Sequence, residues 1–281
     1  MASSTDYEIA CYEHPGLRLP KSERDSLQKE LSDFAADYLN PLPRYNIFDT
    51  SSPVALDDKV IVTARVSDTG ALAAFVSASL IPIPGLDSTN PKRAVPVLNT
   101  GLTIIHHAHR KSHHVKRLLF GTLFLHMFAR FPEGMWLVSL AEVITSLVQI
   151  ARYTQNCFPC PPSWPNSAGS APSKIHLQIA REISLNHRRK FLINRDAKFD
   201  EERFVFLESN NTAEGMVFMK DVDDRRYWHR DEEATGFFRG FFRRNMGDEV
   251  LQVGWLEPEH VVGLGTREGF KRGGDGIVSR L

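Results

Sequence analysis

Cysteine is scarce in this sequence, with three residues in 281, and so small and odd a number excludes a disulfide framework. Free thiols are typical of a reducing compartment, so we expect the protein in the cytoplasm. No apolar run approaches the roughly 20 residues of a membrane span, and the first residues lack a basic segment followed by an apolar core. The sequence therefore predicts an unsecreted protein without membrane contact.

A net charge is also missing, because 34 Lys and Arg balance 34 Asp and Glu. This balance excludes a bulk attraction to nucleic acid or to anionic lipid, so any such attraction must come from a local patch. The composition is otherwise ordinary for a globular protein, with 42% hydrophobic residues, enough for one large or two small cores.

Acidic residues are absent from one long window that is rich in positive charge. No Asp or Glu lies between Asp87 and Glu133, while seven Lys or Arg do. At its centre, His106 to Leu119 reads HHAHRKSHHVKRLL, with five histidines and four Lys or Arg. An anion is the ligand that this composition favours.

Several hypotheses compete for this basic stretch. His109 and His113 have a spacing that can share a divalent ion, but Arg110 stands where zinc proteases carry Glu, and cations repel a metal, so we expect no metal. Stacking aromatics are absent from the stretch, so we expect no nucleic acid. A phosphate site at a helix N-terminus fits best, and a merely solvated turn is its strongest rival.

The hydrophobic pattern predicts a mixed α/β arrangement. We expect a helix over 22–40 with Ser22 as its cap, and a strand hairpin over 59–83. A strand over 94–107 then leads into the basic stretch, followed by a buried helix over 115–131, a strand over 134–142 and a helix over 146–158. Beyond a Pro- and Ser-rich linker, the expected elements are a basic helix over 174–191, a hairpin over 203–221, a charged helix over 231–245 and a strand over 249–257.

The order of these elements and two local patterns resemble the GNAT superfamily of acyl-CoA-dependent N-acyltransferases. In that family a loop of pattern R-x-x-G-x-G/A joins a strand to an apolar helix and holds the coenzyme A pyrophosphate. Arg110 matches the Arg, while His113 and Val115 take the places of the two glycines. Because glycine lets a ligand approach the backbone closely, their replacement can weaken coenzyme binding.

The second pattern is N-x-x-A-x-x-x-Y-x-x-x-G-F, which the family carries on the helix after the next strand. Tyr153 matches the Tyr and Phe158 the Phe, whereas Ser146, Gln149 and Cys157 replace the Asn, Ala and Gly. The two patterns stand in the family's order with a strand between them.

This resemblance implies a GNAT-like fold, with a central mixed, mostly antiparallel sheet flanked by helices and a C-terminal extension. It implies acetyl-CoA or another acyl-CoA as co-substrate, a small-molecule amine as acceptor and no metal cofactor, and it leaves a homodimer open. Tyr153 would protonate the departing thiolate, and Glu142 is the expected general base, with His106 or His107 as alternatives. The residues expected to bind coenzyme A are Leu102, Ile104, Ile105, Arg110, Lys111, Ser112, His113, His114, Val115 and Lys116.

We expect four segments along the chain: a GNAT-like core over 1–160, a linker over 161–173, strands and helices over 174–260 that complete the sheet or form a lid, and a mobile tail over 261–281. Two alternatives to the acyltransferase remain. The chain could be a non-catalytic GNAT-like protein that binds a ligand or a protein, which the missing glycines favour, or an enzyme of different chemistry on the same scaffold.

Overall fold

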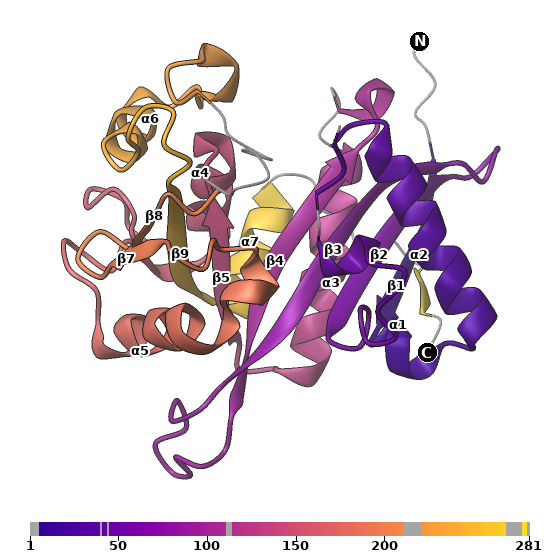
Figure 1. The fold of residues 1–281 in the computed structure, drawn as a ribbon, viewed down its shortest axis with the longest axis horizontal. Coiled ribbons are helices and arrows are strands. Elements are labelled where there is room, and N and C mark those ends of the chain that lie inside the picture. The colour runs from indigo at the N-terminus through magenta and orange to yellow at the C-terminus, as the bar shows by residue number, and fades with distance from the viewer. Residues whose placement is uncertain are drawn as a thin grey trace. The chain divides into compact units, whose positions relative to one another are not determined.

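The computed structural model describes residues 6–39, 41–43, 45–110, 114–210, 221–267 and 277–279. The chain forms two compact units (Figure 1). The first comprises residues 1–80, 100–133 and 262–281, and the second comprises residues 81–99 and 134–261. The long strands β3 and β4 begin in one unit and end in the other, because the unit boundaries fall at residues 80 and 99.

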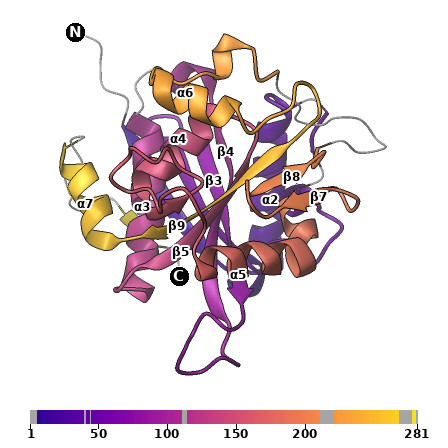
Figure 2. The same cartoon turned by 90° about the vertical axis from the view of Figure 1, so that its left-hand side faces the viewer.

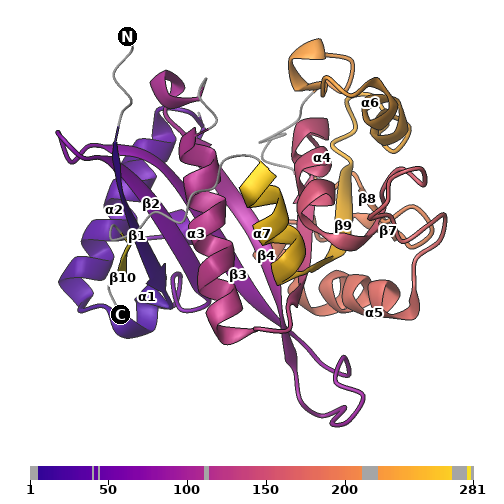
Figure 3. The same ribbon diagram turned by 180° about the vertical axis from the view of Figure 1, so that it is seen from behind.

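The first unit holds a sheet with strand order β10-β1-β2-β3-β4. Its elements are β1 (Tyr7–Glu13), α1 (Pro15–Arg18), α2 (Lys21–Ala36), β2 (Lys59–Val66), most of β3 (Leu72–Ile83), the end of β4 (Val95–Ile105), α3 (His114–Arg130) and β10 (Ile277–Ser279). Strands β1, β2 and β3 are antiparallel neighbours, and β10 adds to β1 in parallel. The helix α2 covers one face of these strands and α3 the other (Figures 1 and 3).

The core of this unit forms where α2 meets the sheet. Leu27, Leu31 and Ala35 recur at helical spacing on α2 and are buried against Ile61 of β2 and Phe75 of β3. Burial of this stripe removes apolar surface from water, which is the main driving force for docking a helix on a sheet.

Glycine is required at one point of β4. Gly101 has a φ of 52°, and a Cβ there would lie 2.1 Å from the carbonyl oxygen of Ser77 on β3. Only a residue without a side chain lets β4 pass β3 at this distance, so Gly101 fixes the path of the strand toward the basic stretch.

The second unit holds the strand order β4-β5-β9-β8-β7 (Figure 2). Its elements are β5 (Met135–Ala141), α4 (Ile144–Tyr153), β6 (Gln155–Phe158), α5 (Lys174–Glu182), β7 (Lys198–Asp200), β8 (Val205–Leu207), α6 (Glu232–Arg239), β9 (Glu249–Leu256) and the start of α7 (Pro258–Arg267). Strand β5 is parallel to β4 and antiparallel to β9, and β6 also pairs with β9. Side chains from β9, α5 and the β7–β8 pair fill its main core.

The expected fold class, a mixed and mostly antiparallel sheet flanked by helices, is confirmed. The expected helices and strands between residues 21 and 141 are present, as are α5, α6 and β9. The second strand of the expected 203–221 hairpin lies outside the described residues, and β8 pairs instead with β7 and β9. Within the described ranges, no helix is long and apolar enough to cross a membrane.

Two details of the helices were predicted wrongly. The cap of α2 is Pro20, and Ser22 lies inside the helix. The helix expected over 146–158 ends at Tyr153, because Thr154 takes an extended conformation and residues 155–158 pair with β9. The side chain of Asn166 donates to the carbonyl oxygens of Ala151 and Thr154, which replaces the helical hydrogen bonds lost at that end.

Candidate functional site

The basic stretch begins with a short turn that the end of β4 holds in place. His106 precedes a 3₁₀ turn over His107–His109, and its Nδ1 accepts a hydrogen bond from the backbone N–H of Ala108 at 3.2 Å. Arg110 folds back, with Nε donating to the carbonyl oxygen of Ile105 at 2.8 Å. The turn is therefore fixed on both sides before the chain reaches α3.

Aromatic side chains support this turn from two other elements of the first unit. The guanidinium of Arg110 lies 5.4 Å from the centre of the Tyr38 ring, just beyond α2. The hydroxyl of Tyr7 on β1 lies 2.8 Å from His109 Nδ1, within hydrogen-bond distance. The imidazoles of His106 and His107 lie next to each other with centres 4.2 Å apart and ring planes tilted by 31°. Tyr7 and Tyr38 thus bring aromatic rings to a stretch that has no Phe, Tyr or Trp of its own next to its histidines and Arg110.

Burial and neighbouring cations lower the proton affinity of two groups in the basic stretch, His106 and Lys116. Burial, together with the neighbouring His107, His109 and Arg110, holds the pKa of His106 below its usual value. Burial also lowers the pKa of Lys116 in the first turn of α3. Each of these groups would gain its proton more readily if an anion bound beside it, because a nearby negative charge favours the charged form.

Besides Arg110 and Lys116, the residues expected to bind coenzyme A include Ile105, which is half-buried at the end of β4. The others fall into three groups. Leu102 and Ile104 pack into the core against α2, so their backbone groups alone are candidates for ligand contact. His114 is exposed at the start of α3, whereas Val115 is fully buried, so the side chain that replaces the second glycine is directed into the protein. Lys111, Ser112 and His113 lie outside the described residues.

The two expected catalytic residues belong to the second unit. Glu142 directly follows β5 and is half-buried. Tyr153 is the last residue of α4 and is also half-buried. The helix is fixed beneath Tyr153 by a buried stripe of Ile144, Leu147, Val148, Ile150 and Ala151.

A second carboxylate, which the sequence did not reveal, lies beside Glu142. The β5–β9 register pairs Ala141 with Val250, the residues next to Glu142 and Glu249 in the chain. The Ser209 hydroxyl donates to Glu249 Oε2, and the Asn210 amide donates to Glu142 Oε2 at 3.3 Å. Burial, opposed by these donors and reinforced by the charge of Glu142, raises the pKa of Glu249 to about 7.

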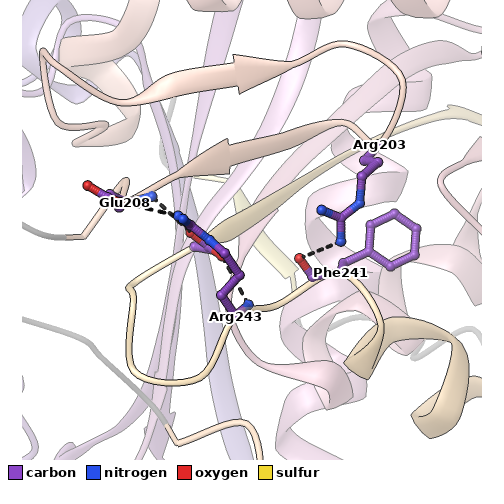
Figure 4. A network of polar contacts seen from close by, with 5 residues as sticks. Arg203, Glu208, Phe241 and Arg243 are labelled. Carbon is purple, nitrogen blue, oxygen red and sulfur yellow. Dashed lines mark hydrogen bonds and ion pairs between the residues drawn. The ribbon is translucent and has the colours of Figure 1, made fainter.

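The start of β9, which carries Glu249, is anchored by a polar network (Figure 4). The buried carboxylate of Asp248 accepts hydrogen bonds from the side chain of Arg243 and from the backbone N–H of Glu208. Arg203 extends the network by donating to the carbonyl oxygens of Gly240 and Phe241 at 2.7 and 3.1 Å. This network ties β8, β9 and the segment after α6 together around Glu249.

The histidines of the basic stretch have a spacing that is compatible with a shared metal ion. Among the residues whose placement is described, no three His, Cys, Asp or Glu side chains come together in a way that could hold a metal ion. His113, one of the two histidines with metal-ligand spacing, is not among those residues.

No protein-family model matches the chain, and no curated protein matches it in sequence. Solved structures do share part of its fold. NAA60 of Arabidopsis thaliana in complex with acetyl-CoA is 17% identical, over 51% of this chain and 82% of that chain, with a TM-score of 0.35. Ribosomal-protein-alanine N-acetyltransferase from Brucella melitensis biovar Abortus 2308 is 19% identical, over 42% and 70%, with a TM-score of 0.28.

Malonyl-CoA decarboxylase from Agrobacterium vitis matches over 97% of this chain and 65% of that chain, at 12% identity and a TM-score of 0.34. All three likenesses are partial. Conclusions about function therefore depend on the residues of this chain.

Proposed function

We propose that the protein is an acyl-CoA-dependent N-acyltransferase, which moves an acyl group, with acetyl expected, from coenzyme A to an amine of a small molecule. The observation that carries the proposal is the placement of Arg110 and Tyr153. Arg110 lies in the turn between β4 and α3, and Tyr153 ends the helix that follows β5, as the resemblance to the GNAT superfamily requires.

The basic turn is the part of the chain proposed to bind the pyrophosphate. Arg110 keeps its planar guanidinium beside Tyr38 with Nε bound to Ile105, so its outer nitrogens are the ones that would contact a phosphate. Planar guanidinium groups bind phosphate oxygens in a bidentate manner. The histidines of the turn would add positive charge on binding, because a nearby anion raises their pKa.

Chemistry would take place with both substrates bound together, so most of the rate would come from positioning. A neutral amine attacks the thioester carbonyl, and a carboxylate accepts its proton. Glu142 is the residue proposed for this step, since it is half-buried at the end of β5. Tyr153 would give its hydroxyl proton to the departing thiolate of coenzyme A.

Calorimetric titration with acetyl-CoA and with free coenzyme A tests the proposal. We expect binding by the wild-type protein, weakened about tenfold or more in Arg110→Ala, which corresponds to about 1.4 kcal/mol. Arg195→Ala is the matched control, because Arg195 is fully exposed and 3.9 Å from the carboxylate of Asp196. A folded protein that shows neither heat nor thermal stabilisation with either ligand would overturn the proposal.

Turnover separates the enzyme from a non-catalytic binding protein. The measurement is release of free thiol from acetyl-CoA in the presence of a panel of primary amines, including polyamines and aminoglycosides. Transfer to at least one amine supports the enzyme. Tight coenzyme binding without transfer to any amine would instead favour the non-catalytic alternative.

A further inference from the structure

The carboxylates of Glu142 and Glu249 lie near each other, next to the end of the β5–β9 strand pairing. The antiparallel register pairs Leu140 with Leu251 and Ala141 with Val250. Glu142 directly follows β5 and Glu249 begins β9, and the side-chain amide of Asn210 hydrogen-bonds to both carboxylates, which therefore lie close together. Two negative charges that lie close together repel each other, and burial strengthens the repulsion.

The segment after β8 holds this pair of carboxylates in place. Ser209 and Asn210 are both buried, and the backbone N–H of Asn210 donates to the carbonyl oxygen of Gly247 at 2.9 Å. Their side chains donate to Glu249 Oε2 and to Glu142 Oε2, and the Asn210 amide also hydrogen-bonds to Glu249. The two donors therefore keep the carboxylates together in spite of their repulsion.

Among the described residues, charged groups near Glu249 come from several elements. From β5, Glu142 is the charged group that acts on it. On β9 itself, the preceding residue Asp248 is neutralised by Arg243, whose guanidinium also lies 3.5 Å from Glu208. From β8, the residue opposite Glu249 is the apolar Phe206. Arg243, the cation nearest to Glu249 in sequence, is thus already engaged by other carboxylates, and the charge of Glu142 adds to the effect of burial on Glu249.

We propose that Glu142 and Glu249, whose carboxylates both contact the side-chain amide of Asn210, act as one proton-accepting unit that holds a single proton between them. The chemical role rests on the proposed function, whereas the shared proton does not. Glu249 is then the second carboxylate of the base, and Glu142 is not a base on its own. Burial raises the pKa of Glu249 to about 7, which suits a base that works near neutral pH.

The proton balance of the transfer follows from this arrangement. The amine nitrogen forms a bond to the acyl carbon, and the carbon–sulfur bond breaks. The ionised Glu142–Glu249 unit takes the proton from nitrogen, while the thiolate takes the hydroxyl proton of Tyr153. Return of the shared proton to solvent and reprotonation of Tyr153 from solvent complete the cycle, with no other reactant.

Infrared titration of the folded protein, without any substrate, tests the shared proton. The signal is the carbonyl stretch of a protonated carboxyl group, followed from acid to neutral pH in wild type, Glu142→Gln, Glu249→Gln and the control Glu208→Gln. We expect wild type and the control to keep one protonated carboxyl at about pH 6, where an ordinary glutamate is ionised. Glu249→Gln should lose it, because the protonated carboxyl is removed, and Glu142→Gln should keep it only to a lower pH, because the repulsion that reinforces burial is removed.

Ser209→Ala keeps both carboxylates but removes a donor that favours ionised Glu249, so the signal should persist to higher pH. This variant keeps the test valid if a glutamine variant fails to fold. Absence of a protonated carboxyl at about pH 6 in wild type would overturn the inference, as would its loss in Glu208→Gln.

The pH dependence of acyl transfer tests the role of the unit as a base. In the Glu142→Gln variant, the acid limb of the kcat/KM profile should move to lower pH, and kcat should fall about a hundredfold. An unchanged profile in both glutamine variants would overturn the role as a base. If the infrared signal behaves as expected while wild type transfers no acyl group, the proposed function fails and the shared proton stands.

Discussion

Arg243 holds the carboxylate of Asp248 with two parallel hydrogen bonds, Nη2 to Oδ1 at 2.7 Å and Nε to Oδ2 at 2.9 Å (Figure 4). Asp248 is 1% exposed and also accepts from the backbone N–H groups of Glu208 and Arg243. Burial would raise the pKa of Asp248, but these hydrogen bonds outweigh it and lower the pKa below its usual value. These hydrogen bonds hold Asp248 in place, directly before Glu249 in the chain.

Removal of this guanidinium should therefore destabilise the fold. We expect Arg243→Ala to lower the free energy of unfolding by about 2 kcal/mol, because Asp248 keeps its backbone donors but loses two charged ones. The neighbouring Arg244 is a matched control, since it approaches Asp221 and Asp223 only at 4.0 and 3.7 Å on the surface. Arg244→Ala should cost less than about 0.5 kcal/mol. Urea denaturation checks both values, and equal losses would contradict the interpretation.

The raised pKa of Glu249 should make stability depend on pH in a particular direction. The folded state binds this proton more tightly than the unfolded state, in which the carboxyl titrates near 4.5. The free energy of unfolding should therefore fall as pH rises from about 4.5 to about 7, by at most about 3 kcal/mol. Asp248, with its lowered pKa, acts only below about pH 4.

Denaturation curves at a series of pH values test this dependence. Glu249→Gln should remove the decline between about pH 4.5 and 7, because glutamine does not titrate. A decline of the same size in wild type and in Glu249→Gln would assign the effect to another group.

Tyr153 is expected to matter for the chemical step and not for coenzyme binding. Tyr153→Phe removes the proposed proton donor, so kcat for acyl transfer should fall about a hundredfold with little change in the affinity for acetyl-CoA. Tyr12→Phe, which removes a hydroxyl from β1, is the control expected to keep wild-type kcat. Single-turnover rates are the measurement, because slow product release could hide the chemical step. An unaltered single-turnover rate in Tyr153→Phe would exclude the assigned role.

Coenzyme binding should take up protons at the basic turn. Burial and the cationic neighbours His107, His109 and Arg110 hold the pKa of His106 down, and a bound pyrophosphate would reverse much of that effect. Near pH 6 the binding enthalpy should then vary with the ionisation enthalpy of the buffer. His106→Gln should reduce the variation, whereas His260→Gln should not, because His260 binds Gln155 and the carbonyl oxygen of Arg152. Identical enthalpies in all buffers would contradict this prediction.

Local sequence patterns predicted most of the elements correctly. The apolar stripe of α2 and the β-branched runs of β2, β3 and β4 are determined by residues close together in the chain, so their periodicity can be read directly. The end of α4 was predicted wrongly, because it depends on Asn166 and on pairing with β9, which lie outside any local window. The strands β6, β7 and β10 have only three or four residues, too few for a clear pattern, and were not predicted; the seven-residue β1 was also not predicted.

The sequence by itself determined which residue types are available: the acid-free basic stretch with Arg110, Glu142 at the end of a strand, and Tyr153 on the helix that follows. Only the tertiary structure decided their partners. Tyr38 and Tyr7 reach the basic turn from other elements, and Glu249 meets Glu142 through the β5–β9 register. Strand register is set by side-chain packing and hydrogen bonds between distant segments, so the proton affinity of a carboxylate at the strand end cannot be read from its own neighbours in sequence.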